Sequence, residues 1–546
     1  MNFLTIDITH PTDSHKSCAI NSNAPNTYIA NIEDSSKTLL YTRLPSGLSA
    51  EELMIKIERK DWRFIATSEY NFVVALIVES KQGTSVTLIR DRFASQRVLI
   101  SETPHKTLIT TDPNHPILRS KPWDPKAIVR ALSSRIVTNS ALEKEIQVLP
   151  FLQGISISTS RKLQYFNTHD SSLSIEKSSN SISDASAIKG IKQSLKNTFQ
   201  ELQTDEPIAV LLSGGVDSFI LAATAAQYFD SVIAYTPDWS DGENPELERA
   251  KRFAETLQIP HKIIQINEQD FIQAFDELIN AIGVPIRNYS ALVLHSLLKH
   301  IDETDILYGH YADTLFGSSQ IKSGIIDAKL LKVAKYVPSK LMPIAIRRTL
   351  EKIKASGLRD LVVIPEIADD VITKQLYAMG YENPQVTQHE HRADFSRERA
   401  IEFNIAVSCS HQIFELETSA LHMGKRIVSP FYNASMLEIS NRLSDQQMFG
   451  LSGASLIKSF KQDTSDQVKP LLKQLACEYI EKDAIYQKKL GFPIPRDQWV
   501  RALLSSNTSP LYSDHLAKLE LMNTETVWSL FNINYLNDKR LPSGNE

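Results

Sequence analysis

The strongest structural constraint in this sequence is a short apolar run that is followed by a pair of glycines and then by a helical pattern. Residues 208–213 read IAVLLS, and GGVDS follows before the alanine-rich FILAATAA. Ligands of open α/β sheets gather beyond the carboxyl ends of the strands, where glycines admit an oxyanion to backbone N–H groups and the next helix presents its positive N-terminus. The sequence therefore predicts an anion-binding turn formed by Leu212, Ser213, Gly214, Gly215, Val216, Asp217 and Ser218.

Short buried strands alternate with long helical patterns after this turn. The predicted strands are 208–213, 232–237, 261–267 and 305–310. Their spacing is typical of βα units around a parallel sheet. The sequence therefore predicts an α/β fold for this half of the chain, with an added helical and often basic region from about residue 330 onward.

The first 165 residues have a different pattern, with short β-branched segments separated by turn formers. The predicted strands are 72–79, 85–93, 97–101, 107–111 and 154–159. Residues 167–186 are polar and serine-rich without any period, which is typical of a linker. We therefore expect a β-rich domain over 1–166 and an α/β domain over 187–546.

Composition excludes several classes of protein. The chain has 546 residues, too many for one compact core, so two or three domains are expected. A net charge of −5 gives no reason to expect binding to nucleic acid or to an anionic membrane, and the apolar runs are too short to span a bilayer. Three widely spaced cysteines, Cys18, Cys409 and Cys477, argue against a disulfide framework and a zinc site. The N-terminal residues lack the pattern of a secretory signal, so the default expectation is a soluble cytoplasmic protein.

The turn differs from two other phosphate-binding patterns, since no GK[ST] follows it and it lacks the spacing of GxGxxG. It resembles the PP-loop of ATP pyrophosphatases, which cleave ATP to AMP and pyrophosphate while activating a carboxyl or carbonyl oxygen. The resemblance implies that the loop holds the pyrophosphate end of ATP. Ser213 and Ser218 can donate hydrogen bonds to phosphate oxygens, and Asp217 can hold a Mg²⁺ ion. Tyr235 and Thr236, in the next strand, are further candidates for nucleotide binding.

A second segment resembles asparagine synthetase and its relatives. YGHYADTLFG at 308–317 is similar to that family's G-x-G-[GA]-D-E-L-F-G segment. The resemblance implies that Gly309 lies at the nucleotide and that Asp313, together with Asp217, binds magnesium. Two carboxylates at the ends of adjacent strands suit Mg²⁺, which usually takes one or two protein carboxylates alongside phosphate oxygens. The alternative for Asp313 is a helix N-cap.

Four more segments are similar to the same family. QKKLGFPIPRDQW at 487–499 resembles K-x-G-F-x-x-P…W, which implies that Lys489 faces the acyl-adenylate, where a fixed cation stabilises developing charge. The alternative for this lysine is a solvated surface position. GKRIVSPFYNASMLEIS at 424–440 resembles EARVPFLD. In the first half, LIRDRFASQRVLI at 88–100 resembles ARDRFGxxPLYY, and VLPFLQGISIST at 148–159 resembles LPPGHxL.

The similar segments cover roughly residues 65–500 and imply a glutaminase-like (Ntn-type) domain followed by an ATP-dependent synthetase domain. Glutamine-dependent asparagine synthetases begin Met-Cys, and the cysteine, exposed at the mature terminus, attacks the glutamine amide. This chain begins Met1-Asn2, and Cys18 lies in a loop-like context. Without a thiolate there is no thioester and no ammonia from glutamine. We therefore expect a degenerate glutaminase domain, with nitrogen supplied by free ammonia, by an amine in the substrate or by a second molecule.

The predicted acceptor site departs from the family pattern at two positions. Where EARVPF carries glutamate, this chain has Arg426 if Pro430 is aligned. β-Lactam synthetases, another cysteine-free branch, pair that glutamate with a tyrosine three residues before the second magnesium aspartate, and here that position is His310. A histidine beside an acyl-adenylate could deprotonate an attacking ammonium or amine, because histidine titrates near neutrality. The alternative for His310 is a hydrogen-bonded structural imidazole.

The arrangement G-H-x-[GA]-D without a glutamate base is what we expect of lasso-peptide cyclases. These adenylate an Asp or Glu side chain of a precursor peptide, and the N-terminal amine of the peptide then closes a macrolactam. The resemblance implies a peptide substrate and a separate leader-processing protein as partners. The basic helical segment 328–360 would suit one side of a peptide-binding site, but we favour the alternative interpretation, an amphipathic helix with solvated lysines.

Two other functions stay open. One is a small-molecule ligase, either a β-lactam synthetase or an amide synthetase that uses ammonia or an amine, and the KKLGFPIP stretch favours this alternative. The other is a non-catalytic scaffold, which the intact Asp217, Ser218 and Asp313 disfavour. Every catalytic alternative requires ATP and Mg²⁺, a carboxylate that attacks the α-phosphorus, and an amine that attacks the resulting acyl-adenylate. The largest catalytic contributions would be positioning and electrostatic stabilisation.

Overall fold

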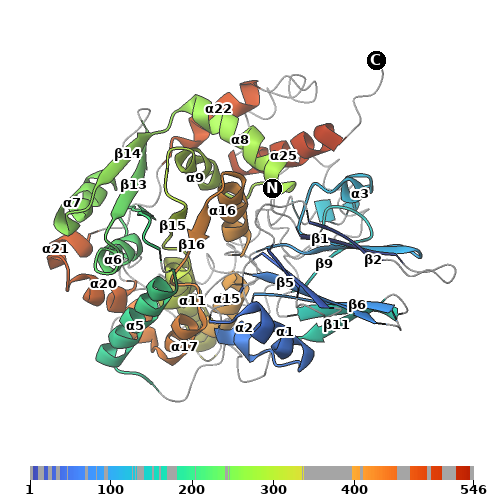
Figure 1. The fold of residues 1–546 in the computed structure, drawn as a ribbon. Coiled ribbons are helices and arrows are strands. Elements are labelled where there is room, and N and C mark those ends of the chain that lie inside the picture. Colours follow the sequence, from blue (N-terminus) through green and yellow to red (C-terminus); the bar gives the residue numbers. More distant parts are fainter. Residues whose placement is uncertain are drawn as a thin grey trace.

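The computed structural model describes residues 4–540 with gaps, of which the longest are 10–17, 132–140, 169–180, 337–395, 452–467, 488–493 and 507–523. A β-rich N-terminal half lies beside an α/β C-terminal half (Figure 1). Among the helices of the described residues, none combines the length and the apolar character that crossing a bilayer requires.

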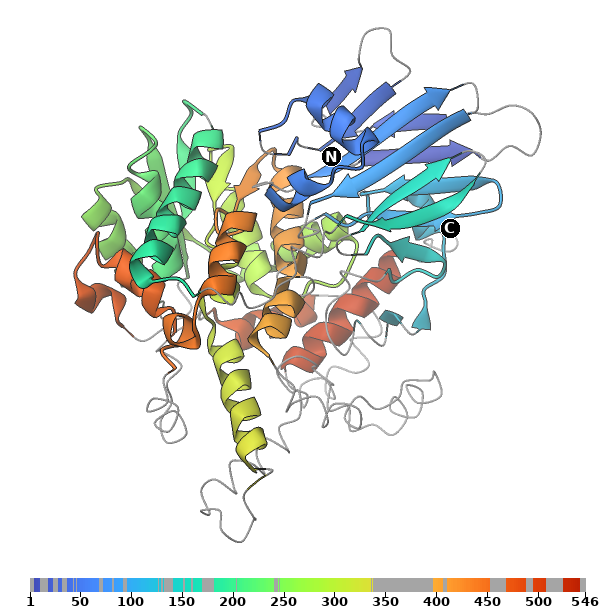
Figure 2. The ribbon, with the colours of Figure 1, turned by 90° about the horizontal axis from the view of Figure 1, so that it is seen from below.

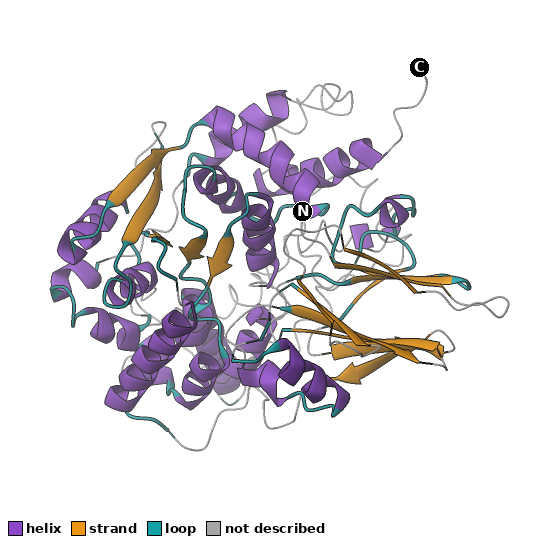
Figure 3. Ribbon diagram, viewed as in Figure 1, coloured by secondary structure: helices purple, strands orange, loops and turns teal. Residues whose placement is uncertain are grey.

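The N-terminal half consists of two antiparallel sheets (Figure 3). The first has the order β2-β1-β8-β7-β9 and consists of β1 (Leu4–Thr9), β2 (Cys18–Ser22), β7 (Leu99–Glu102), β8 (Lys106–Thr110) and β9 (Ile146–Val148). The second has the order β11-β10-β6-β5-β4-β3 and consists of β3 (Tyr28–Asn31), β4 (Lys37–Tyr41), β5 (Val73–Ser80), β6 (Gly83–Arg90), β10 (Gln153–Ser158) and β11 (Arg161–Asn167). Hydrophobic residues of both sheets form one buried cluster, so the two sheets pack as a sandwich.

Short helices cover the outer faces of this sandwich. α1 (Ala50–Glu58) and α2 (Arg63–Thr67) pack their apolar residues against the second sheet. α3 (Pro116–Arg119) packs Leu118 against Leu99 of the first sheet. Both sheets are therefore buried on the inner face and partly covered on the outer one, which explains why their strands lack a clean apolar–polar alternation.

The structure confirms the five strands predicted in this half, which are β5, β6, β7, β8 and β10. The other six strands were not predicted, because they are short and several carry polar residues in place of the expected apolar run, as in KTLLY and RKLQYFN. Facing antiparallel sheets occur in many unrelated folds, so the glutaminase-like character of this half stays a prediction.

A parallel sheet lies at the centre of the C-terminal half and has the order β14-β13-β12-β15-β16. Its strands are β12 (Ile208–Leu211), β13 (Val232–Asp238), β14 (His261–Gln265), β15 (Asp305–Leu307) and β16 (Arg426–Val428). All four neighbouring pairs run parallel. The predicted α/β fold is therefore confirmed, while β16, with three residues, is too short to have been predicted from its pattern.

Helices surround the parallel sheet and extend beyond it, with α11 projecting from the body (yellow in Figure 2). They are α5 (Asp184–Leu202), α6 (Val216–Ala225), α7 (Leu247–Leu257), α8 (Glu268–Ile282), α9 (Ser290–Leu298), α10 (Ala312–Phe316), α11 (Ser319–Ala334), α15 (Arg397–Phe403), α16 (Ser410–His422), α17 (Ala434–Arg442), α18 (Asp445–Phe449), α20 (Pro470–Ala476), α21 (Lys482–Ile485), α22 (Arg496–Ser506) and α25 (Thr524–Arg540).

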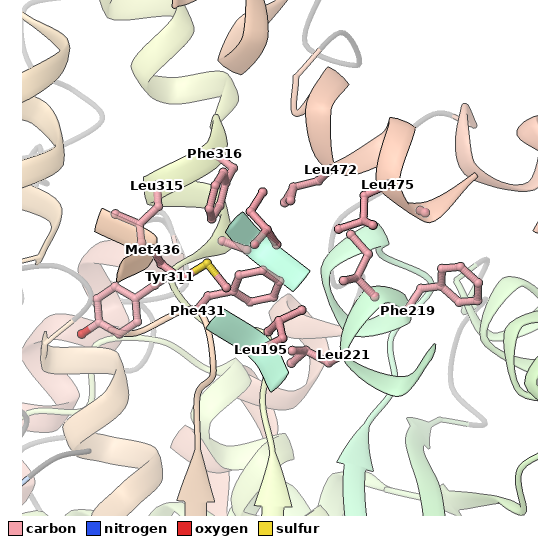
Figure 4. Packing of buried hydrophobic residues seen from close by; sticks show 14 of the residues in the cluster. Leu195, Phe219, Leu221, Tyr311, Leu315, Phe316, Phe431, Met436, Leu472 and Leu475 are labelled. Atoms are coloured by element: carbon pink, nitrogen blue, oxygen red, sulfur yellow. The ribbon is translucent and has the colours of Figure 1, made fainter. Parts of the chain in front are cut away.

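The central strand β12 is buried on both faces. Ile208 and Val210 belong to a cluster with residues of α5, α6, α17 and α20, part of which Figure 4 shows. Ala209 and Leu211 belong to a second cluster, with residues of α9 and α16. Alternate residues of the strand therefore face two different helical layers, as expected of a strand inside a parallel sheet. This burial fixes where the strand ends and the glycine turn begins.

A further hydrophobic cluster joins the two halves of the chain. It contains Trp499 of α22 and Trp528 of α25, both fully buried, together with residues of α8 and α9. Ala131 and Leu142 of the N-terminal half belong to the same cluster. The two halves of the chain therefore contribute residues to one common hydrophobic cluster.

Hydrogen bonds also cross between the halves. The side-chain amide of Asn114 donates to the carbonyl of Asn280 at 2.6 Å. The hydroxyl of Tyr432 donates to Asp91 Oδ1 at 3.1 Å, and both of these residues are buried.

The predicted linker and the predicted basic helix lie largely beyond what can be described. β11 ends at Asn167 and α5 begins at Asp184, so the last three positions of the segment 167–186 form the first turn of a helix. Residues 169–180 lie outside the described residues. Of the segment 328–360, α11 accounts for the part up to Ala334, and residues 337–360 lie outside the described residues.

Candidate functional site

The predicted anion-binding turn connects β12 to α6. The N–H of Leu212 donates to the carbonyl of Tyr235 at 2.9 Å, which extends the pairing of β12 and β13 by one residue. The hydroxyls of Ser213 and Ser218 lie 3.0 Å apart, and the N–H of Ser213 donates to Ser218 Oγ at 3.1 Å. The N–H of Gly215 donates to Ser213 Oγ at 3.2 Å. The two serines thus hold the turn together from within.

The turn packs tightly against the start of α7. A Cβ on Gly214 would lie 2.7 Å from the carbonyl oxygen of Glu246, a separation that real Cβ atoms essentially never show. The guanidinium of Arg249 donates to the carbonyl of Gly214 at 3.2 Å. Val216 then begins α6, whose first turn holds Asp217. The structure therefore places a cation beside the turn that the sequence did not predict.

Two predicted carboxylates lie together because β12 and β15 are neighbouring strands. Asp217 lies in the first turn of α6 and Asp313 in the first turn of α10. Gly309 lies against the first of them, since a Cβ on this glycine would be 3.3 Å from Asp217 Cβ. The turns that follow the two strands therefore form one edge of the sheet, where ligands of such folds bind.

The ammonium of Lys469 lies between the two carboxylates. It pairs with Asp217 Oδ2 at very short range and with Asp313 Oδ1 at 2.5 Å. Only 4% of the lysine side chain is exposed, against 16% for Asp217 and 50% for Asp313. Burial lowers the pKa of this ammonium, but the charges of the two aspartates outweigh burial and hold the pKa above its ordinary value. Lys469 therefore carries a positive charge throughout the neutral range.

The backbone around Lys469 is unusual. The residue caps α20 in the left-handed region, with φ 56° and ψ 44°, and Pro470 follows as the first helical residue. Its N–H donates to the carbonyl of Met448 at 2.9 Å. Gly317, at φ 126°, approaches so closely that an added Cβ would lie 2.1 Å from the same carbonyl oxygen. The only cue in the sequence is a lysine before a proline that starts a helix, which does not distinguish this lysine from others.

The donor set fits a magnesium ion that is completed by phosphate oxygens. Two carboxylates converge on one point, and Mg²⁺ usually binds to one or two protein carboxylates while keeping waters or substrate oxygens as its other ligands. Within the described ranges, no group of three or more His, Cys, Asp or Glu side chains could hold a metal ion by itself. Asp217 and Asp313 are therefore suited to a metal that arrives with a nucleotide.

His310 lies on the turn between β15 and α10, three residues before Asp313. Its ring stacks on Tyr308, with centroids 5.4 Å apart and an interplanar angle of 9°, and meets the ring of Tyr311 edge-on at 4.6 Å. The imidazole is partly exposed. The structure therefore places the predicted base on the same turn as one of the two carboxylates, with an aromatic neighbour on each side.

Two other predicted nucleotide contacts lie in β13. Thr236 is buried, and its hydroxyl donates to the carbonyl of Leu212 at 2.5 Å and lies 2.7 Å from His261 Nε2. The hydroxyl of Tyr235 donates to Glu303 at 2.8 Å, near the amino end of β15. The tyrosine side chain therefore points away from the glycine turn, so only its backbone lies beside Leu212.

The remaining candidates lie elsewhere. Lys489 falls outside the described residues. Arg426 is paired in register with Asp305 at the amino ends of β16 and β15, and its Nε donates to Asp305 Oδ1 at 2.6 Å. This edge is opposite to the one that carries the glycine turn. The structure therefore gives Arg426 an ion pair within the sheet and places it away from His310.

Comparison with known proteins identifies a family that the chain matches. The profile of the asparagine synthase family matches residues 190–540. Asparagine synthetase [glutamine-hydrolyzing] 1 of Bacillus subtilis is 22% identical over 363 residues, which are 60% of this chain and 55% of the relative. A putative asparagine synthetase of Mycobacterium tuberculosis is 22% identical over 324 residues, which are 56% of this chain and 47% of the relative. The chain thus spans about half the length of these curated relatives.

Solved structures give weaker matches. An NH3-dependent NAD synthetase from Campylobacter jejuni has 16% sequence identity and a TM-score of 0.21, with coverage of 39% of this chain and 94% of that one. A likeness of this size supports no argument about the present chain.

Proposed function

The chain belongs to the asparagine synthase family, and from this premise we propose that it adenylates a carboxylate with ATP and transfers the acyl group to an amine. The observation that carries the proposal is the convergence of Asp217, Asp313 and Lys469 beside the glycine turn. Two carboxylates and a buried cation at the carboxyl edge of a parallel sheet suit a polyphosphate bound with Mg²⁺.

In the first step a carboxylate oxygen of the substrate attacks the α-phosphorus of ATP, and pyrophosphate leaves with the electron pair of the broken P–O bond. The hydroxyls of Ser213 and Ser218 can turn from each other toward phosphate oxygens. Asp217 and Asp313 would hold the Mg²⁺ ion, which offsets phosphate charge when bound. Lys469 contributes a fixed positive charge that stabilises the leaving pyrophosphate.

In the second step an amine nitrogen attacks the acyl carbon, and AMP leaves with the electrons of the acyl–oxygen bond. The attacking amine must lose a proton. His310 is the histidine that the turn between β15 and α10 supplies near Asp313, and a neutral imidazole accepts protons near pH 7. We therefore assign His310 as the general base of amide formation.

For the substrate we propose a peptide, with macrolactam closure between its N-terminal amine and an Asp or Glu side chain. The support is the G-H-x-[GA]-D turn, in which His310 stands where β-lactam synthetases have tyrosine, and the position of Arg426 at the far edge of the sheet. A separate protein that processes the leader of the precursor peptide would then act with this chain.

A second candidate is an amide synthetase for a small carboxylic acid that uses ammonia or an amine, with a β-lactam synthetase as its intramolecular form. The similarity to asparagine synthetases favours it. We also propose that glutamine is not the nitrogen source in either case, which release of glutamate from added glutamine would contradict.

The test is pyrophosphate release from Mg·ATP, with mass spectrometry of the products. One panel holds peptides with a free N-terminal glycine and an acidic residue several positions on. The other panel holds small amino diacids and β-amino acids, with and without ammonia. Release with loss of one water from a peptide supports the macrolactam function, whereas release with small acids alone supports the second candidate.

Two variants serve as controls. Asp217→Asn removes a predicted magnesium ligand and should slow pyrophosphate release by at least about a hundredfold. Asp302→Asn changes an exposed aspartate that pairs with Lys262 at 3.3 Å near the opposite edge of the sheet, and should behave as the wild type. If neither panel gives pyrophosphate release and Mg·ATP does not bind in calorimetry, the proposed function is overturned and a non-catalytic scaffold is favoured.

A further inference from the structure

We propose that Tyr311 is a positioning residue through which the N-terminal half sets the geometry of the turn that carries His310 and Asp313. The consequence for catalysis rests on the proposed function, whereas the geometric claim does not. The path consists of three side chains in contact: Asp91 of the N-terminal half, Tyr432 after β16, and Tyr311 itself.

The backbone of Tyr311 adopts a conformation that a bulky residue avoids. Its φ of 70° and ψ of −18° lie in the left-handed region, where the Cβ of an L-residue is crowded. The similar family segment has glycine at this position, which adopts such angles without crowding. A tyrosine persists there only if its surroundings hold it, so the side-chain contacts of Tyr311 determine its backbone.

One of those contacts is with a second tyrosine, Tyr432. The rings of Tyr311 and Tyr432 lie 4.2 Å apart, and the two side chains are 2% and 3% exposed. Figure 4 shows Tyr311 at the edge of the cluster that contains Leu315 and Met436, with its hydroxyl directed away from the other labelled residues. If the backbone of Tyr311 changed from the left-handed to an extended conformation, its ring would move and displace the ring of Tyr432.

Tyr432 is anchored by the N-terminal half. Its hydroxyl donates to Asp91 Oδ1 at 3.1 Å, and the N–H of Asp91 donates to the carbonyl of Phe72 in the neighbouring strand segment at 2.8 Å. The preceding Arg90 is buried and donates to the carbonyl of Gln96 at 3.0 Å. Burial and the charge of Asp91 raise the pKa of Tyr432 well above its usual value, so the phenol stays a donor.

The residues on either side of Tyr311 are those that the reaction needs. His310 precedes it directly, and Asp313 lies two positions later in the first turn of α10. The carbonyl of Tyr311 accepts the N–H of Leu315 at 2.9 Å, so its backbone also starts that helix. A change of φ at this residue would turn the imidazole relative to the carboxylate. The side chain of Tyr311 therefore acts on the site through its backbone.

Four variants of the full chain test the proposal. Tyr432→Phe removes the bond to Asp91 and keeps the ring. Tyr311→Gly allows the same backbone φ but removes the side chain that holds it. Tyr311→Phe is the conservative variant, because it keeps the ring. Asn114→Ala is the matched control, because it removes a different side-chain donor that bridges the halves, to the carbonyls of Asn280 and Ala281.

Two measurements are made on each variant. The first is the ¹³Cε1–¹H resonance of His310 in the nucleotide-free protein, identified by its absence from His310→Gln. The second is the calorimetric Kd for Mg²⁺ with adenosine 5′-(α,β-methylene)triphosphate. We expect Tyr432→Phe and Tyr311→Gly to shift the resonance and to weaken binding. For Tyr432→Phe the weakening should lie between about threefold and tenfold, the range that loss of one hydrogen bond corresponds to. Tyr311→Phe and Asn114→Ala should change neither.

An unmoved resonance in Tyr432→Phe overturns the positioning role, because this variant keeps both rings, whereas Tyr311→Gly also removes the ring that meets His310 edge-on. So does an equal shift in Asn114→Ala, since the effect would then come from general loosening between the halves. If the wild type binds no Mg²⁺–nucleotide analogue, the proposed function fails, and the His310 resonance still decides whether Tyr311 positions the turn.

Discussion

Asp217 and Lys469 are 252 positions apart in the chain and form a buried ion pair at the carboxyl edge of the parallel sheet. The same ammonium also contacts Asp313, so one lysine neutralises two carboxylates that would otherwise repel each other. This arrangement keeps both oxygens in place before any metal ion arrives. Phosphate oxygens that bind to the lysine would compete for its charge and leave the carboxylates to Mg²⁺.

Replacement of Lys469 by methionine should make the thermal stability of the protein depend on Mg²⁺ even without a nucleotide. Without the ammonium the two carboxylates repel, and the loss of one partner from a buried pair costs about 3 kcal/mol, the lower end of the usual range because Asp313 is half exposed. Mg²⁺ should therefore raise the unfolding temperature of Lys469→Met more than that of the wild type. An equal magnesium response in thermal denaturation would show that the lysine does not compete with the metal.

Replacement of Asp217 by asparagine keeps the size of the side chain and removes its charge. We expect pyrophosphate release to fall at least about a hundredfold, as is usual when an electrostatic contact to the transition state is lost. The magnesium concentration needed for half-maximal rate should rise as well. Release at the normal rate would rule out Asp217 as a metal ligand.

Replacement of His310 by glutamine should separate the two chemical steps. Pyrophosphate release is expected to persist, while amide formation slows by about 10² to 10⁴, the usual contribution of a general base. The pH dependence of amide formation near neutrality should disappear with it. Product formation that is unchanged at every pH would leave His310 with a structural role only.

The Arg426–Asp305 pair should contribute to stability and not to catalysis. Arg426→Gln leaves a carboxylate that is 5% exposed without its cation, at a cost of about 1 to 3 kcal/mol, whereas the double variant with Asp305→Asn should lose less. Pyrophosphate release is expected to match the wild type in both. A selective loss of amide formation in Arg426→Gln would return this arginine to the acceptor site.

Stability should fall as the pH drops below about 6.5, the ordinary pKa of histidine. Burial lowers the pKa of His261, His295 and His422, so their neutral forms favour the folded state above that pH and their protonation opposes folding below it. Burial would raise the pKa of Glu277, but hydrogen bonds from Lys299 and His295 bring it to about 2, so this carboxylate stays charged over the same window.

Each histidine that stays neutral in the fold contributes a slope of at most about 1.4 kcal/mol per pH unit. Urea unfolding between pH 7.5 and 5 measures it, and His422→Gln should reduce the slope. A free energy of unfolding that is constant over this range would contradict the assignment.

The glycine turn was predictable because its signal is local. Burial of β12, the serines that bond to each other and Asp217 in the first turn of α6 all follow from about ten consecutive residues. The partnership with Asp313 was also predictable, since parallel strands end at a common edge. The order of strands across the sheet, which puts β15 beside β12, needed the structure.

Lys469 was not predictable from the sequence. Its role depends on a left-handed backbone and on contact with residues more than 150 positions away, and neither leaves a local pattern. The role of Arg426 was open for a different reason: alignment on Pro430 gives the order of residues but not the end of the strand at which Arg426 lies. An aromatic residue such as Tyr311 does not itself indicate a positive φ, and the one sign in the sequence is that the similar family segment has glycine at this position.

Gly317 bears on how mutational data for this chain should be interpreted. Any side chain at this position would collide with the carbonyl of Met448, the same group that holds the backbone of Lys469. In a saturation library selected for activity, codon 317 should be depleted as severely as the codons for Asp217 and Lys469, although no atom of the glycine is assigned a part in the reaction. Intolerance to substitution near this site therefore cannot by itself distinguish chemistry from support, and a selection for folding alone would separate them.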